Sequence, residues 1–153
     1  RKKIFESIDW EGIDLKLIGP WRIGSRSKLR QFLTNNMIDN ELTVDLYNHT
    51  KIALNIHRSG GYSANPRTFE ISACGTFQIC DKQREVQEIF GDSIIYFDSD
   101  LEDLIRFWLK KEERNELAKR AQAIAMQNTF VHRAKELLSK LEGGEYNRNH
   151  TWD

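Results

Sequence analysis

Short apolar runs alternate with segments of helical periodicity over residues 1–97. The strands that this pattern predicts cover residues 14–18, 51–56, 76–80 and 93–97. The helices predicted before and between these strands cover residues 2–10, 26–36, 41–49, 66–74 and 84–90. The run KIALNI at 51–56 is typical of a strand buried on both faces. Strand–helix–strand alternation with short connections predicts an α/β fold: a Rossmann-like parallel sheet with helices on both faces.

A run of helices follows the last predicted strand, over residues 100–110, 113–126 and 130–141. Apolar residues recur in them at the i, i+3, i+4 spacing of a helix that packs one face on a core. In the last helix the stripe consists of Phe130, Ala134, Leu137, Leu138 and Leu141. In the helix at 41–49 the residues expected to point inward are Leu42, Leu46 and Tyr47. We expect one domain over residues 1–142 and a flexible tail over 143–153.

Composition and charge exclude some partners. The 153 residues hold 23 Lys and Arg against 23 Asp and Glu, so no net charge favours nucleic acid or an anionic membrane. No apolar run reaches the roughly 18 residues of a transmembrane segment, and no signal peptide is visible. Cys74 and Cys80 are too few for a disulfide scaffold or a zinc site, and we interpret both as buried thiols. This cysteine usage predicts a cytoplasmic protein.

The segment HRSGGYSANPRTFEISACG at 57–75 holds the main candidate site. It follows the strand 51–56 and begins a helix at Asn65 and Pro66, a good N-cap and a good first helical residue. In a parallel sheet this loop lies at the carboxyl ends of the strands, where ligands bind. A glycine-rich loop before a helix exposes backbone N–H groups that can bind an anion such as phosphate.

Arg67 and Glu70 are the chemically informative residues of this helix. A cation in the first turn of a helix costs roughly 0.3–1 kcal/mol, but a bound phosphate would pair with the Arg67 guanidinium. Glu70 lies three residues further on, on the same side, and could accept hydrogen bonds from ribose hydroxyls. The alternative is an exposed Arg67–Glu70 ion pair with no ligand. The residues alone favour neither interpretation.

Two other features suggest a metal or a base. Asp98 and Asp100 could hold a divalent cation next to a diphosphate. Ser99 and Glu102 have the spacing of a capping box, however, and we prefer that interpretation. His57 leaves a strand at the ligand edge, where it could act as a general base, contact phosphate, or simply pack.

The motif N-P-R-T-F-E-I-x-A-C-G at 65–75, together with the strands around it, resembles the C-terminal domain of group 1 glycosyltransferases. Among these enzymes, the chain most resembles the subgroup related to the spore maturation protein CgeB. The resemblance covers residues 14–141 and includes EVQEIFGDSIIYFDSDLEDL and NTFVHRAKELL. It implies one half of a GT-B architecture, in which two Rossmann-like domains face each other across a cleft. The C-terminal domain of such an enzyme holds the nucleotide-sugar donor, and the N-terminal domain mostly holds the acceptor.

The resemblance also implies roles for residues of the candidate site. Glu70 corresponds by position to the Glu that binds the donor ribose, and Arg67 lies close to the phosphates. His57 and Arg58 are expected as auxiliary contacts. The loop that contacts the diphosphate and the sugar maps to Gly60, Gly61, Tyr62, Ser63, Ala64 and Asn65. The nucleotide-sugar is a substrate, and transfer in this architecture typically needs no metal or other cofactor.

The sequence departs from the family pattern in three ways. Tyr62 stands where many relatives have a second Glu, which puts the sugar contact of that Glu and retaining chemistry in doubt. Residues 128–130 read Asn-Thr-Phe where relatives of the subgroup often have His-Thr-Tyr. The acceptor domain and the first strand of the donor domain have no counterpart, so we expect a fragment that binds donor without turning it over. We therefore assign no catalytic residue and no acceptor.

The main alternative is a non-catalytic nucleotide-binding or interaction module that keeps the half-fold, and Tyr62 slightly favours it. A flavodoxin-like signalling domain is a poorer interpretation. Such a domain would have clustered acidic residues at the end of its first strand, and LKLIGPW at 15–21 has none.

Overall fold

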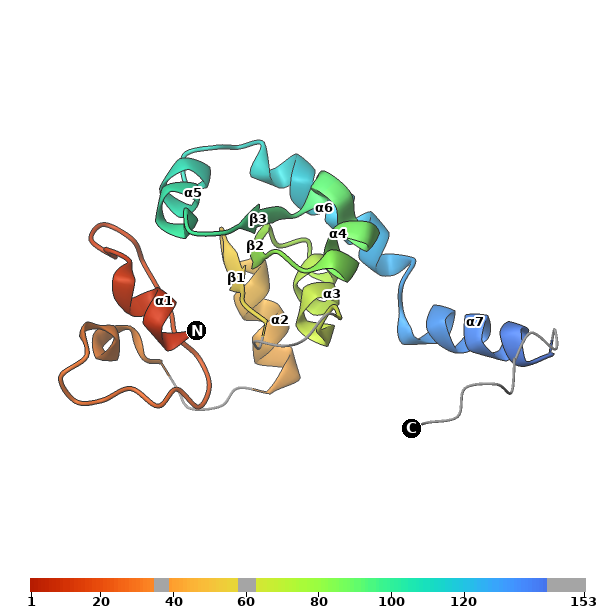
Figure 1. Ribbon diagram of the computed structural model, residues 1–153, viewed down its shortest axis with the longest axis horizontal. Coiled ribbons are helices and arrows are strands. Elements are labelled where there is room, and N and C mark those ends of the chain that lie inside the picture. Colours follow the sequence, from red (N-terminus) through yellow and green to blue (C-terminus); the bar gives the residue numbers. More distant parts are fainter. Residues whose placement is uncertain (35–38, 58–62, 143–153) are drawn as a thin grey trace.

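The computed structural model describes residues 1–34, 39–57 and 63–142 (Figure 1). Its elements, in chain order, are α1 (Lys2–Ser7), the 3-10 helix η1 (Lys28–Phe32), α2 (Asn40–Asn48), β1 (Ala53–Asn55), α3 (Pro66–Ala73), β2 (Gln78–Asp81), α4 (Arg84–Phe90), the 3-10 turn η2 (Gly91–Ser93), β3 (Ile95–Phe97), α5 (Leu101–Trp108), α6 (Arg114–Met126) and α7 (Phe130–Glu142).

The three strands form a parallel sheet in the order β1-β2-β3. Ala53 pairs with Gln78, and Ile79 pairs with Ile95. Right-handed crossovers between consecutive parallel strands place the connecting helices on one face. In Figure 1, α3, α4 and α6 lie on one side of the sheet and α1 and α5 on the other. The predicted Rossmann-like α/β fold, with helices on both faces and a run of helices at the end, is therefore confirmed.

Neighbouring residues of β2 show how the two faces are covered. Successive side chains of a strand point to opposite faces. Ile79 belongs to the core cluster that contains Leu101 of α5, whereas Cys80 belongs to the cluster that contains Val86 of α4 and Ala121 of α6. Ile79 and Cys80 are both fully buried. The sheet is thus packed between two apolar layers, one on each face.

The N-terminal part of the chain is less regular than its pattern predicts. The strand predicted at 14–18 is only an isolated parallel bridge between Leu17 and Leu33. The helix predicted at 26–36 is only the 3-10 helix η1. Leu17 and Leu29 are nevertheless buried, so the apolar residues of this region reach the core without long regular elements.

The helix predicted at 2–10 ends early, at Ser7. The chain leaves the helix so that Trp10 can fold back onto it. The Trp10 indole Nε1 donates to the carbonyl oxygen of Phe5 at 2.8 Å, and the two rings stack with their centroids 5.6 Å apart. Trp10 is buried by this arrangement.

Two apolar stripes are not covered as predicted. The side chains of α7 are exposed from Phe130 to Leu141, with Phe130 at 88 % of its full exposure. Figure 1 shows α7 extending away from the sheet. In α2, Leu42 is exposed, whereas Leu46 and Tyr47 are half-buried. Periodicity therefore predicted both helices, but burial of a stripe also needs a surface to cover it.

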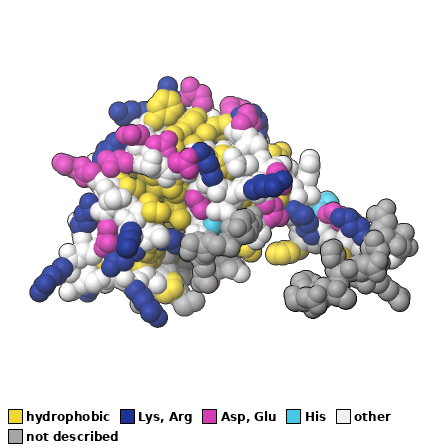
Figure 2. Space-filling view, in the orientation of Figure 1, with side chains coloured by type: hydrophobic (Ala, Val, Ile, Leu, Met, Phe, Trp, Pro, Cys, Tyr) yellow, Lys and Arg dark blue, Asp and Glu magenta, His cyan; other side chains and the backbone are white. Residues whose placement is uncertain are grey.

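The surface agrees with the balanced charge of the sequence. Basic and acidic side chains are intermixed over the face shown in Figure 2. Among the described residues, no helix has the length and apolar character required to cross a membrane.

Gly75 lies just beyond α3, which ends at Ala73, one residue before the predicted end of this helix. Its φ is +69°, in the left-handed range that L residues avoid. A Cβ at this position would lie 3.2 Å from Nε2 of Gln122, whose amide donates to the carbonyl oxygen of Ala73 at 2.9 Å. Both the backbone and the contact with α6 therefore favour glycine.

We expect Gly75→Ala to lower the free energy of unfolding by about 1–2 kcal/mol, measured by urea denaturation. The matched control is Gly24→Ala, because Gly24 has no left-handed φ and its added Cβ would meet no heavy atom within 4 Å. The control should change stability by less than about 0.5 kcal/mol. Equal losses in the two variants would show that neither the left-handed backbone nor the Gln122 contact matters.

Candidate functional site

Asn65 starts α3 and attaches it to the sheet. Its side-chain Oδ1 accepts the backbone N–H of Thr68 at 3.0 Å, and its Nδ2 donates to Oδ1 of Asn55 in β1 at 3.1 Å. Pro66 follows as the first helical residue, where a missing N–H costs nothing. The predicted helix start is therefore confirmed.

A buried polar network continues beneath α3. Asn55 Nδ2 donates to Thr68 Oγ1 at 2.9 Å, and Gln78 Nε2 donates to Ser72 Oγ at 2.8 Å and to the Thr68 carbonyl oxygen at 3.0 Å. All four residues are at least 98 % buried. Leaving one such group unpaired costs about 1–3 kcal/mol. The network therefore fixes where α3 lies over β1 and β2.

Sequence reasoning missed this network, although a signal was present. Asn55 interrupts the apolar run 51–56, and Gln78 interrupts the run 76–80. A polar side chain that points into a buried layer needs a polar partner on the element above it. Thr68 and Ser72 of α3 supply those partners.

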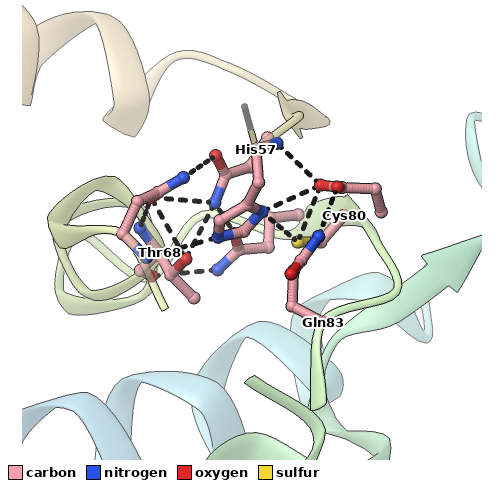
Figure 3. Close-up of polar contacts among 8 residues, drawn as sticks. His57, Thr68, Cys80 and Gln83 are labelled. Carbon is pink, nitrogen blue, oxygen red and sulfur yellow. Dashed lines mark hydrogen bonds and ion pairs between the residues drawn. The ribbon is translucent and has the colours of Figure 1, made fainter. Parts of the chain in front are cut away.

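His57 lies at the carboxyl end of β1 with both ring nitrogens hydrogen bonded. Nδ1 donates to Asp81 Oδ1 at 2.8 Å, and Nε2 accepts the backbone N–H of Asn65 at 3.2 Å. Because a backbone N–H can only donate, Nε2 carries no proton and the imidazole is the neutral Nδ1–H tautomer. Figure 3 shows His57 between Thr68 of α3 and Cys80 of β2.

Asp81, the last residue of β2, accepts hydrogen bonds on both carboxylate oxygens. Oδ1 accepts the backbone N–H and the ring N–H of His57, each at 2.8 Å, and Oδ2 accepts from Gln83 Nε2 at 2.8 Å. Burial alone would raise the pKa of Asp81, but these hydrogen bonds outweigh burial and hold the pKa below its usual range. Asp81 is therefore a carboxylate with a fixed orientation.

His57, Cys80 and Asp81 also form a possible metal-ligand group within the described residues, since their ligand atoms lie within 4.8 Å of one another. The hydrogen bonds argue against a metal. A metal on His57 Nδ1 would move the ring proton to Nε2, which faces the N–H donor of Asn65. A metal-bound histidine normally donates its second N–H to an acceptor. The group is better explained as a hydrogen-bonded unit.

The two cysteines differ in exposure. Cys80 is fully buried as predicted, but Cys74 at the end of α3 is only partly buried, so that part of the prediction is wrong. Burial raises the pKa of both thiols, and the Asp81 carboxylate raises that of Cys80 further. Neither thiol is therefore an activated nucleophile.

Part of the predicted loop lies outside the described residues: Arg58, Gly60, Gly61 and Tyr62. Ser63 is exposed at the start of the described part. The backbone N–H of Ala64 donates to Glu85 Oε2 at 2.7 Å, and the N–H of Asn65 donates to His57. A phosphate at either N–H group would have to replace one of these two acceptors.

Arg67 and Glu70 are both exposed on α3 and lie near Tyr47 of α2. Burial raises the pKa of the Tyr47 phenol; the Arg67 charge lowers it and the Glu70 charge raises it. Among the ion pairs of the described residues, none joins Arg67 to Glu70. Sequence reasoning placed Tyr47 in the core, but Tyr47 borders the candidate site.

The predicted capping box of Ser99 and Glu102 is wrong. The N-cap of α5 is Asp100, which makes no side-chain cap bond, so Glu102 lies one position too early in the helix to complete a box. Glu102 instead accepts the backbone N–H of Asp9 at 3.0 Å. Asp100 Oδ1 accepts the backbone N–H of Asp98 at 3.1 Å.

Described residues line two surface cavities that include neither His57 nor residues 63–70. One of them, with a volume of about 280 Å³, lies at the amino ends of β1 and β2, where Lys51, Thr76 and Arg114 line it. His57 and Asn65 lie at the opposite edge of the sheet, whereas Tyr47, which lies near Arg67 and Glu70, also lines this cavity.

The fold and this edge define a Rossmann-like α/β domain with its polar residues gathered at the carboxyl ends of parallel strands. A family model described as glycosyl transferase-like matches residues 1–139. The chain belongs to this glycosyl transferase-like family, whose activity requires a sugar donor and an acceptor. No curated protein and no solved structure matches the chain. The predicted relationship to glycosyltransferases is thus confirmed at the level of the family.

The lowered pKa of Asp81 predicts a specific dependence of stability on pH. Its contribution is fully present above the unfolded-state pKa of about 4 and is lost as the pH falls through the lower folded-state pKa. We expect the free energy of unfolding of Asp81→Asn to fall less steeply below about pH 4 than that of the wild type.

Chemical denaturation at a series of pH values measures this difference. The control is Asp14→Asn, which removes an exposed carboxylate that no described residue hydrogen bonds. If the free energy of unfolding of Asp81→Asn falls below pH 4 as steeply as that of the wild type and the control, the lowered pKa of Asp81 is contradicted.

Proposed function

We propose that residues 58–70, supported by His57, bind the nucleotide-sugar donor of a GT-B glycosyltransferase related to the CgeB subgroup. Membership of the family supports this proposal. The observation that carries it is the placement of Arg67 and Glu70, which are exposed side by side on a helix whose buried face is hydrogen bonded to the sheet. Among the described residues no ion pair joins the two, and the side chain of Arg67 hydrogen bonds the Tyr47 phenol, so its charge has no carboxylate partner there.

The proposed roles follow the chemistry of the donor. Glu70 accepts hydrogen bonds from the ribose hydroxyls, and Arg67 pairs with the diphosphate. Residues of the segment 58–65 contact the diphosphate and the sugar in this proposal, and His57 supports them from the end of β1. Tyr47 joins this set because its phenol lies beside Arg67 and Glu70.

In the proposed reaction the bond between the sugar and the diphosphate breaks, and an acceptor oxygen forms the new bond to the sugar. Negative charge develops on the leaving nucleoside diphosphate. The Arg67 guanidinium and the N-terminus of α3 would offset that charge without a metal. The acceptor and the catalytic base belong to a second domain in this proposal. The free thiol of buried Cys80 suits a reducing, cytoplasmic location.

A non-catalytic module is the second candidate, and one observation favours it. The N–H groups of Ala64 and Asn65 already have acceptors, Glu85 and His57. Because these two N–H groups are already hydrogen bonded within the chain, they gain less from binding a phosphate. Binding of a nucleotide would argue against this candidate, because the Glu85 acceptor would then be replaceable.

We expect one of the nucleotides UDP, GDP, ADP and CMP to bind the chain, with amide shifts in NMR spectra concentrated at residues 57–70. Glu70→Ala should weaken that binding by about 5- to 150-fold, which corresponds to about 1–3 kcal/mol for a lost polar partner. Glu116→Ala removes an exposed Glu of α6 that pairs with Lys119, and it should leave affinity unchanged. Absence of binding at millimolar concentration, or equal affinities for both variants, would overturn the donor site.

Glu85→Gln should strengthen nucleoside diphosphate binding by about 2- to 5-fold, because it keeps an acceptor for Ala64 but removes a like charge from the phosphate site. The gain should shrink in high salt, which screens charges. Glu88→Gln, on the exposed face of α4 beside Arg84, is the control. Weaker binding by Glu85→Gln in isothermal titration calorimetry would mean that the carboxylate is not a competitor of the ligand.

A further inference from the structure

A chain of hydrogen bonds runs from the end of β2 to the first turn of α3. Asp81 Oδ1 accepts the Nδ1–H of His57 at 2.8 Å, and His57 Nε2 accepts the backbone N–H of Asn65 at 3.2 Å. Asn65 Oδ1 then accepts the N–H of Thr68 at 3.0 Å. The four residues come from different parts of the fold: Asp81 from β2, His57 from two residues beyond β1, Asn65 from the N-cap of α3, and Thr68 from α3 itself. The chain therefore spans both ends of the proposed donor-binding loop.

We propose that Asp81 and His57 are positioning residues for the donor site, a role that rests on the proposed function. His57 does not touch the donor in this proposal. Its side chain is only 4 % exposed, and both ring nitrogens are used within the protein. It acts through Asn65, whose position determines where the first turn of α3 lies and hence where Arg67 and Glu70 lie.

The Asp81 carboxylate decides which ring nitrogen of His57 carries the proton. Its oxygens can only accept, so the nitrogen that faces Oδ1 is protonated and the other keeps its lone pair for Asn65. Gln83 donates to the second oxygen and prevents the carboxylate from turning. The opposite tautomer would place an N–H against the N–H of Asn65. The positioning function therefore depends on Asp81 as much as on His57.

Two substitutions of His57 separate the roles of its two ring nitrogens. In His57→Gln the side-chain carbonyl oxygen can reach the Nε2 position and accept from Asn65, but the link to Asp81 is lost. In His57→Asn the side-chain amide can donate to Asp81 from the Nδ1 position, but the N–H of Asn65 is left without its acceptor. Asn65 therefore remains positioned in the first variant and not in the second.

We expect nitrogen NMR of the wild type to show Nδ1 protonated and Nε2 unprotonated. Amide hydrogen exchange at Asn65 and Thr68 should be roughly tenfold faster in His57→Asn, because a buried donor loses its acceptor. His57→Gln should lie between this variant and the wild type. The affinity for the nucleotide that binds the wild type should fall in the same order.

Ile94→Val is the control for a merely structural effect. Ile94 is 1 % exposed and lies in the core cluster of Cys80, but its side chain forms none of the hydrogen bonds that join Asp81, His57 and Asn65, so the variant lowers global stability and leaves these bonds in place. A protonated Nε2 in the wild type, or exchange at Asn65 in His57→Asn no faster than in Ile94→Val, would overturn the proposal. If the wild type binds no nucleotide, the proposed function fails. The tautomer and the exchange rates then decide by themselves whether His57 positions Asn65.

Discussion

The buried amide of Asn55 is the interaction on which the rest of the site depends. An amide taken out of water must have its donors and acceptor paired, and Asn55 finds partners in Thr68 and Asn65 of the α3 region and in Gln78 of β2. An apolar contact tolerates a small slip of the helix, because one methyl group packs much like another. A satisfied polar network does not, so it specifies one position of α3 on the sheet.

That single position divides α3 into two functional faces. Asn65, Thr68 and Ser72 recur at helical spacing and point to the sheet, where they are hydrogen bonded. Arg67 and Glu70 lie on the other side and are exposed. Once its hydrogen bonds are formed, the buried polar face of α3 carries no further desolvation cost. It also holds the helix in one position, so that Arg67 and Glu70 on the exposed face are held with it. Preorganisation of this kind lowers the entropic cost of binding a ligand.

Local signals explain what the sequence could predict. The start of α3 depends on Asn65 and Pro66, and its end on Gly75, so residues close in the chain determine both. The strand predicted at 14–18 is wrong because only Leu17 of that run finds a pairing partner, in an isolated bridge to Leu33. The stripe of α7 predicted a helix, but nothing in a stripe says whether a surface covers it. The partners of His57 come from β2 and the loop, and no spacing rule brings Asp81 and His57 together.

The charge of Arg67 bears on the two interpretations that the residues alone left equal. If Arg67 had only a structural role, Glu70 would be its natural partner at i+3, yet the described residues form no such ion pair. The neighbouring Tyr47 phenol can accept a hydrogen bond, but it is neutral and does not compensate a cation at a helix N-terminus. A diphosphate would supply both the missing charge and oxygens for the guanidinium. The small electrostatic cost of Arg67 therefore has a physical reason if the site binds an anion, and none if it is only a surface pair.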